Sequence, residues 1–345
     1  MSQEIANIFK AYDIRGLVDE EITPDFTFAT GVAFAHFLQQ QREPGTVVIG
    51  EDMRPSSIPL ADAFSAGVTS LGMDVIRIGL ASTDMLYFAS GKLGLPGAMF
   101  TASHNPAEYN GIKLCLSQAR PIGKESGLQT IENFVRKGSP LELRSVGVET
   151  QRNMLEEYVD HLLSLVDLSN IRQLKIVVDA GNGMAGHTAP AIFARLNCEL
   201  IPMYFELDGS FPNHEANPIE PKNLVALQKR VKKEGADIGL AFDGDADRLG
   251  VVTKDGQVIF PDRQMMLFAK DVLTRNPGGQ IIYDVKCTRN LATWVKQYGG
   301  EPLMWKTGHS LVKAKLKETG APLAGEMSGH IFFKDRWFGF DDGLY

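Results

Sequence analysis

Residues 46–57, TVVIGEDMRPSS, join an apolar, β-branched run to an acidic residue and a polar turn. The same order occurs at residues 175–186, KIVVDAGNGMAG, and at residues 280–290, QIIYDVKCTRN. Short runs rich in valine and isoleucine that end in glycine or polar residues predict buried β-strands followed by loops. The chain therefore carries one structural pattern three times.

Each of these runs opens a longer series of helices and strands. In the first copy, residues 61–72 and 84–94 show helical patterning, and residues 74–80 and 97–100 are apolar runs. The other two copies keep this order. Strands that alternate with helices predict βαβ units, whose crossovers require a largely parallel sheet. We therefore predict an α/β fold of three related α/β domains with mixed, mainly parallel sheets.

The third strand of each copy leads into a polar loop that contains glycine or proline. These loops are TASHNP (residues 101–106), DGDADR (243–248) and GEMSGH (325–330). Ligands of open parallel sheets bind outside the carboxyl ends of the strands, so we expect the three loops to meet in one cleft. The predicted domains cover residues 1–149, 150–255 and 256–345.

Charge and apolar content limit the classes of partner. The 345 residues include 42 acidic and 35 basic side chains, for a net charge of -7. Such a chain lacks the basic field that gathers nucleic acid or anionic lipid, so a small-molecule partner is favoured. No apolar run approaches the ~20 residues of a membrane span, and the start MSQEIANIFK does not resemble a signal peptide. We expect a cytoplasmic monomer whose cysteines, Cys115, Cys198 and Cys287, form neither a zinc site nor disulfides.

The DGDADR loop is the strongest metal-binding candidate. Asp243, Asp245 and Asp247 alternate with small residues, so their oxygens can face one hard cation. A solvated acidic turn is the plainer alternative, but apolar strands flank the loop and leave little reason for three like charges without a cation. An EF-hand is excluded by counting, because Arg248 and Lys254 occupy the positions of its glycine and glutamate. Mg²⁺ fits best, since it shares its shell with substrate or water.

Two other glycine-rich loops each allow a second interpretation. GNGMAG, residues 181–186, matches the dinucleotide fingerprint, with Glu206 twenty residues further on, and would suit an NAD-type oxidoreductase. The other copies have unrelated residues at this turn, which favours an architectural role. In GEMSGH, the side chains of Glu326, Ser328 and His330 suit hydrogen bonds to sugar hydroxyls, and a capping turn is an equal alternative.

Ser103 stands directly before His104 but lacks the G-x-S-x-G elbow of a hydrolase. We expect His104 not to fold back onto the hydroxyl of its neighbour and to contact phosphate instead. If Ser103 carries a phosphate beside three aspartates and one Mg²⁺, the cleft stays strongly negative. A phosphorylated substrate then needs the basic residues that also follow strand ends: Arg15, Lys113, Arg248, Lys286 and His309.

Together, TASHNP, DGDADR and GEMSGH resemble the loops of the α-D-phosphohexomutases, in particular the bacterial phosphomannomutase/phosphoglucomutase group. The resemblance covers the whole chain from IFKAYDIRG onward. It implies a Mg²⁺-dependent phosphoserine enzyme that interconverts hexose 1-phosphate and hexose 6-phosphate, of mannose or glucose. The reaction would pass through a bound hexose 1,6-bisphosphate that reorients between two phosphoryl transfers.

The resemblance also implies roles for individual residues. Ser103 would be the phosphorylated residue and, with the three aspartates, a metal ligand. The side chains around the reacting phosphate would be Arg15, His104, Lys113 and Arg248. Those that bind substrate would be Lys286, His309, Glu326, Ser328 and His330. Lys113 and His330 are the candidates for general acid and base.

One feature departs from the family pattern. The family has a fourth domain that binds the distant phosphate, whereas this sequence ends at FDDGLY. We expect a truncated form that keeps the serine and metal sites but holds substrate weakly, because remote binding energy is lost. A non-catalytic sugar-phosphate binding module is therefore an alternative, beside the oxidoreductase.

Overall fold

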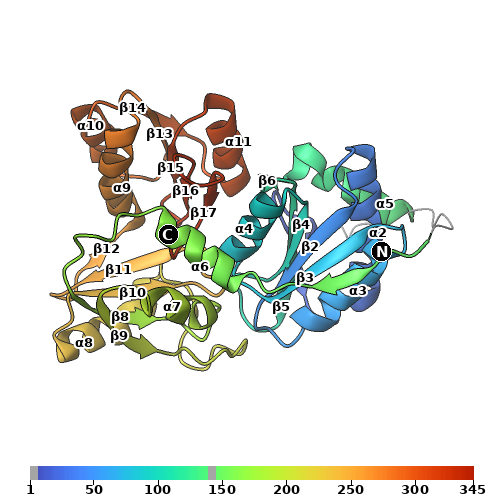
Figure 1. Ribbon diagram of the computed structural model, residues 1–345, viewed down its shortest axis with the longest axis horizontal. Helices are drawn as coiled ribbons and strands as arrows, with labels where there is room; N and C mark the ends of the chain where they lie inside the picture. The colour runs from blue at the N-terminus through green and yellow to red at the C-terminus, as the bar shows by residue number, and fades with distance from the viewer. Residues whose placement is uncertain (1–6, 139–144) are drawn as a thin grey trace. The chain divides into compact units, whose positions relative to one another are not determined.

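The computed structural model describes residues 7–138 and 145–345 and contains three sheets (Figure 1). The first sheet has the strand order β1-β5-β4-β2-β3-β7, with β6 paired to β5. Its strands are β1 (Ile14–Leu17), β2 (Thr46–Glu51), β3 (Asp74–Leu80), β4 (Gly97–Phe100), β5 (Tyr109–Leu116), β6 (Arg120–Pro121) and β7 (Glu149–Gln151). Its helices are α2 (Pro24–Gln40), α3 (Ser57–Thr69), α4 (Thr83–Leu93), η1 (Lys124–Leu128) and α5 (Gln129–Lys137).

The second sheet has the order β12-β11-β10-β8-β9. Its strands are β8 (Leu174–Asp179), β9 (Cys198–Met203), β10 (Ile238–Phe242), β11 (Leu249–Thr253) and β12 (Val258–Ile259). The helices in this part of the chain are α6 (Leu155–Ser164), α7 (Ala185–Phe193), η2 (Pro221–Leu224) and α8 (Val225–Glu234).

The third sheet has the order β14-β13-β15-β16-β17. Its strands are β13 (Gln280–Asp284), β14 (Glu301–Trp305), β15 (Leu323–Gly325), β16 (Ile331–Phe333) and β17 (Phe340–Asp341). Its helices are α9 (Pro261–Arg275), α10 (Asn290–Gln297) and α11 (His309–Thr319).

The three sheets share one topology. In each, the first strand of the repeat lies between the second and third strands and pairs in parallel with both: β2 with β3 and β4, β8 with β9 and β10, and β13 with β14 and β15. An antiparallel strand, β5, β11 or β16, then pairs with the third strand. The predicted α/β class with mixed sheets that contain parallel strands is confirmed. The TASHNP, DGDADR and GEMSGH loops each join a third parallel strand to its antiparallel partner.

The contacts between residues divide the chain into two compact units. The first contains residues 1–158 together with Leu207–Pro212, and the second contains Val159–Glu206 and Asn213–Tyr345. The first sheet continues to Gln151 and the second to Ile259, a few residues past the predicted boundaries. Those boundaries stay predictions, as does the meeting of the three loops. No helix in residues 7–138 or 145–345 is long and apolar enough to cross a bilayer.

Helices α2 and α3 show how the first domain is packed. Thr23 caps α2 by accepting a hydrogen bond from the Phe26 N–H, and Pro24 occupies the first helical turn, where its missing N–H costs nothing. The helices approach closely through Gly31, because a Cβ atom there would lie 2.2 Å from the Phe64 carbonyl oxygen. Small residues at this crossing therefore let the apolar faces of both helices reach the core around Phe34.

Gly31→Ala tests this close approach. Alanine is the better helix former by about 1 kcal/mol, yet the overlap with Phe64 should outweigh that gain and lower the free energy of unfolding by about 1–3 kcal/mol. Urea denaturation measures the difference. Gly45→Ala is the control, because a Cβ there meets no atom within 4 Å. Equal stabilities of the two variants would show that the crossing tolerates a side chain.

Candidate active site

The turn between β10 and β11 gathers three buried carboxylates. Asp243 and Asp245 are fully buried, and Asp247 is 2% exposed. Ala246 has a φ of 64°, in the left-handed region, and its N–H donates to the Asp243 carbonyl oxygen. One ligand oxygen from each aspartate lies within 4.8 Å of the other two. The predicted metal residues are thus brought together on one tight turn.

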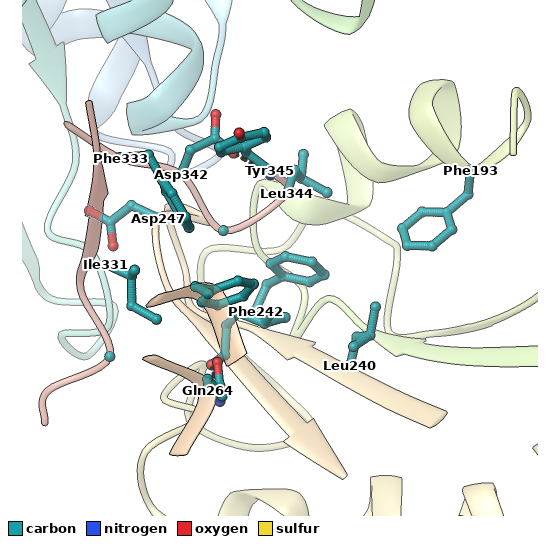
Figure 2. A pocket seen from close by; sticks show the side chains of 14 residues that line it. Phe193, Leu240, Phe242, Asp247, Gln264, Ile331, Phe333, Asp342, Leu344 and Tyr345 are labelled. Atoms are coloured by element: carbon teal, nitrogen blue, oxygen red, sulfur yellow. Dashed lines mark hydrogen bonds between the residues drawn. The ribbon is translucent and has the colours of Figure 1, made fainter. Parts of the chain in front are cut away.

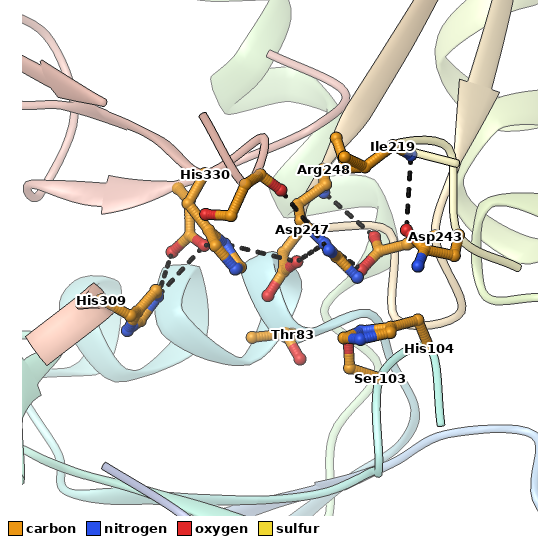
Figure 3. Close-up of polar contacts among 12 residues, drawn as sticks. Thr83, Ser103, His104, Ile219, Asp243, Asp247, Arg248, His309 and His330 are labelled. Atoms are coloured by element: carbon orange, nitrogen blue, oxygen red, sulfur yellow. Dashed lines mark hydrogen bonds and ion pairs between the residues drawn. The ribbon is translucent and has the colours of Figure 1, made fainter. Parts of the chain in front are cut away.

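Arg248 compensates part of this charge. It is 4% exposed, and its Nε donates to Asp243 Oδ2 at 2.7 Å while its backbone N–H donates to Oδ1 at 3.0 Å (Figure 3). Burial raises the pKa of Asp243 to about 8. The positive charge of Arg248 lowers this pKa, and repulsion from Asp247 and Asp245 adds to the effect of burial. Three carboxylates beside one guanidinium would carry a net charge of about -2, which a divalent cation would neutralise.

GNGMAG supports this turn structurally. A Cβ atom on Gly183 would lie 2.7 Å from the Gly244 carbonyl oxygen, and the Met184 N–H donates to that same oxygen. The N–H groups of Asn182 and Gly183 donate to Tyr204 and Ala180. Backbone donors that a dinucleotide pyrophosphate would require are therefore used within the fold. The glycines serve close packing against the carboxylate turn.

A second polar cluster lies in the third domain. Asp341 on β17 is fully buried and accepts from His330 Nδ1 at 2.6 Å and His309 Nε2 at 3.2 Å, and it lies 3.4 Å from Lys313 Nζ. Burial lowers the pKa of His309 to about 3, and the positive charge of Lys313 acts in the same direction. Burial also disfavours the charged form of His330, but Asp247 and Asp341 raise its pKa above the ordinary value. His309 is therefore neutral, and His330 favours its protonated form.

This cluster adjoins the carboxylate turn within the second unit. His330 Nδ1 lies 3.8 Å from Asp247 Oδ1, and Arg248 Nη1 donates to the Ser328 carbonyl oxygen at 3.4 Å (Figure 3). The two histidines and Asp341 could themselves hold a metal ion by distance. The ammonium group of Lys313 beside Asp341 makes them the poorer site, because it already supplies a cation.

The GEMSGH loop makes the contact expected of a capping turn, and its role in sugar binding stays a prediction. Glu326 is 1% exposed, and its Oε1 accepts from the Gly308 N–H at 2.7 Å, which fixes the turn before His309 at the start of α11. This is the capping alternative. Burial raises the pKa of Glu326. Ser328 and His330 remain partly exposed, and Lys286 is exposed after β13.

The serine loop, TASHNP at residues 101–106, belongs to the first unit. Ser103 is 4% exposed with a φ of 52°, and its N–H donates to Thr101 Oγ1. His104 Nδ1 lies 3.2 Å from Ser103 Oγ (Figure 3). The expectation that His104 does not fold back was wrong, because the left-handed backbone at Ser103 turns the two side chains to the same side.

Arg15 and Lys113 lie on neighbouring strands of the same sheet. Arg15 on β1 donates to Asn105 Oδ1 at 2.8 Å and pairs with Asp13 at 2.5 Å. Lys113 on β5 is 7% exposed, with its Nζ 3.5 Å from Thr83 Oγ1. Arg15 is therefore hydrogen-bonded to the serine loop through the side chain of Asn105.

An apolar cavity of about 190 Å³ lies in the second unit, beside Asp247 (Figure 2). Its walls are mainly aromatic and aliphatic: Phe193, Leu240, Phe242, Leu249, Phe268, Ile331, Phe333, Leu344 and Tyr345. Such walls do not suit a hexose phosphate, which needs charged and hydroxyl partners. The candidate site therefore lies on the other side of Asp247, where Arg248 and His330 are its polar neighbours.

Family models match nearly the whole chain. They are described as phosphoglucomutase/phosphomannomutase α/β/α domain I, matched at residues 6–142, domain II at residues 156–256 and domain III at residues 260–345. The chain belongs to the phosphoglucomutase/phosphomannomutase family.

Relatives and a solved structure agree with this membership. A phosphomannomutase/phosphoglucomutase of Pseudomonas aeruginosa is 48% identical over 99% of this chain and 72% of its own length. A phosphoglucomutase of Neisseria meningitidis is 47% identical over all of this chain and 74% of its own length. A phosphoglucomutase/phosphomannomutase family protein of Burkholderia thailandensis has a crystal structure with a TM-score of 0.92 at 49% identity, covering 98% of this chain and 74% of that one.

Two residues near the candidate site have no motif that would predict them from the sequence. Asp341 contacts His309, His330 and Lys313, although it stands eleven residues beyond the GEMSGH motif, in the FDDGLY stretch to which no site was assigned. Arg54 donates to the serine loop from the turn after β2. The sequence signal that could have indicated Arg54 is its place in the turn that follows the first strand of the first repeat.

The ionisation of the two histidines can be measured directly in metal-free protein. We expect histidine NMR signals to show His309 neutral down to well below pH 6.5, because its pKa is about 3, and His330 protonated above that value. Since the unfolded chain protonates His309 first, its contribution to stability is present above about pH 6.5 and is lost as pH falls. Asp341→Asn should lower the pKa of His330. Titration of His309 near its ordinary value would contradict this electrostatic description.

Proposed function

We propose that this chain interconverts the 1-phosphate and 6-phosphate of mannose or glucose through a phosphorylated Ser103. The observation that carries the proposal is the turn of three buried aspartates with Arg248, which suits the charge of a transferring phosphoryl group. Phosphoserine would transfer its phosphoryl group to the free hydroxyl of the hexose phosphate, giving the serine hydroxyl and a hexose 1,6-bisphosphate. After reorientation, the bisphosphate would return its other phosphoryl group to Ser103.

Mg²⁺ is the proposed cofactor, held by Asp243, Asp245 and Asp247 with a phosphate oxygen on Ser103. The fit rests on three buried carboxylates within 4.8 Å of one another and on their oxygen-only donor set. When bound, the ion would neutralise charge on the phosphoryl oxygens and polarise them. Arg248 would orient Asp243 for that purpose through its two hydrogen bonds.

The remaining cations would balance the substrate. A phosphoserine adds about -1.5 to -2 charge at neutral pH, so a second phosphate requires further positive groups. Arg15, anchored by Asp13 and Asn105, and His104, beside the Ser103 hydroxyl, would bind the phosphate at the reaction centre. Lys113, largely buried, would exchange a proton with the sugar hydroxyl.

The third domain would bind the sugar. His330 favours its protonated form and can donate a proton, whereas neutral His309 can donate to Asp341 and accept from a hydroxyl. Ser328 would add a hydroxyl contact, and Glu326 would accept with the oxygen that does not bind Gly308. Exposed Lys286 would pair with phosphate. Lys113 and His330 are thus the proposed acid and base.

The proposed setting is the cytoplasm, where phosphorylated hexoses are metabolised, with the chain as a monomer. Its three cysteines are free thiols in the structure, in keeping with a reducing compartment. The alternative function is a sugar-phosphate binding module without turnover. Mannose and glucose differ in the orientation of one hydroxyl, so an assay of both 1-phosphates is required.

Ser103→Ala tests the covalent step. Intact-mass spectrometry should show one phosphate group on the wild-type protein and none on the variant. Mutase activity on mannose 1-phosphate and glucose 1-phosphate, assayed with hexose 1,6-bisphosphate, should fall at least about 1,000-fold because the phosphoryl carrier is missing.

Ser169→Ala, at an exposed serine, is the matched control and should keep both phosphate and activity. Phosphate retained on Ser103→Ala would refute the assignment of the carrier. Binding of hexose phosphate with no isomer formed by any variant would favour the binding module.

A further inference from the structure

One buried arginine, Arg54, donates hydrogen bonds to the backbone of the serine loop and of the residues that follow it. Arg54 is 1% exposed, and its guanidinium donates to four backbone carbonyl oxygens. Nη2 donates to Ser103 at 3.0 Å and Asn105 at 2.6 Å, and Nη1 donates to Pro106 at 2.7 Å and Tyr109 at 2.9 Å. Four bonds to one rigid, planar group fix the path of the loop.

The plane of this guanidinium is also defined by its own neighbours. Nε lies 3.3 Å from Asp52 Oδ2, and the Arg54 N–H donates to Asp52 Oδ1 at 3.0 Å. The edges of the guanidinium are thus occupied by Asp52 and by the loop carbonyls. Only its faces are left for packing, and a planar cation packs best against an aromatic ring.

The segment Leu207–Pro212 supplies that ring. By its contacts this segment belongs to the first unit, although Glu206 and Asn213 on either side of it belong to the second. The Arg54 guanidinium carbon lies 5.1 Å from the centre of the Phe211 ring. A Cβ atom on Gly209 would lie 2.8 Å from the Arg54 Cα, so glycine is required for the segment to come this close.

The segment holds Phe211 in place by itself. Asp208 Oδ1 accepts from the Ser210 N–H at 2.9 Å and from its hydroxyl at 2.7 Å, and the Phe211 N–H donates to the Asp208 carbonyl oxygen at 3.0 Å. Phe211 has a φ of 51°, a conformation that a phenylalanine rarely adopts. A costly backbone conformation persists only where its surroundings hold it.

We propose that Phe211 is a positioning residue for Ser103 and acts through Arg54. Its ring covers the guanidinium face and keeps water from the carbonyl bonds, which strengthens them. Without the ring, Arg54 gains freedom to tilt, and the four carbonyls lose their common donor plane. The left-handed backbone that presents the Ser103 hydroxyl then loosens.

Hydrogen–deuterium exchange of residues 101–110 tests the proposal without relying on activity. We expect Phe211→Ala to raise the exchange rate of these amides at least about 10-fold. Phe211→Leu, which keeps apolar bulk but lacks the aromatic face, should raise it less. Phe211→Tyr should restore the wild-type rate. The variant Phe28→Ala is the control, because Phe28 packs against the core of the same unit without an aromatic role at Arg54.

A parallel kinetic measurement rests on the proposed function. Phe211→Ala should lower kcat about 10-fold with little change in KM, since the hydroxyl position changes and the sugar contacts do not. Unchanged exchange in Phe211→Ala, or an equal rise in Phe28→Ala, would overturn the positioning role. Faster exchange in Phe211→Ala with no turnover by the wild-type chain would support the role and refute the proposed function instead.

Discussion

The turn from Asp243 to Asp247 imposes the main constraint on this protein. Three carboxylates are buried within a few ångströms of one another, and Arg248 pairs closely with Asp243 and lies 3.8 Å from Asp247. Such a cluster is costly unless a cation relieves it. Three neighbouring features contact this turn. The GNGMAG turn packs against Gly244, and Arg248 donates a hydrogen bond to the GEMSGH loop. His330, which favours its protonated form, lies 3.8 Å from Asp247.

Sequence patterns predicted most of the fold because the repeat is local. The elements predicted for the first copy occur as β2, α3, β3, α4 and β4, and the other two copies keep this order as far as β10 and β15. The order of strands within each sheet depends on pairing between residues far apart in the sequence. The repeat therefore predicted that strands pair in parallel, but not which strands are neighbours. The sheets are mixed because β5, β11 and β16 pair antiparallel with the third strand of each repeat. Each of these strands follows directly after one of the three polar loops.

The candidate site was predictable where chemistry and spacing coincide, as in the three aspartates. It was not predictable where a side chain works through others. Asp341 has no motif of its own, yet against the effect of burial it helps Asp247 to raise the pKa of His330, whereas burial lowers the pKa of His309 to about 3 despite Asp341. His104 was misjudged because the left-handed backbone at Ser103 cannot be inferred from residue types. Arg54 and Phe211 are 157 residues apart, and only folding reveals their contact.

The most direct test of the account is the position of the metal. Crystals of the Ser103-phosphorylated protein soaked in Mn²⁺, which replaces Mg²⁺ among oxygen ligands, would be measured for anomalous scattering. We predict one strong peak among the carboxylate oxygens of Asp243, Asp245 and Asp247, next to the serine phosphate. A peak between His309, His330 and Asp341, or none at the three aspartates under saturating Mn²⁺, would contradict it.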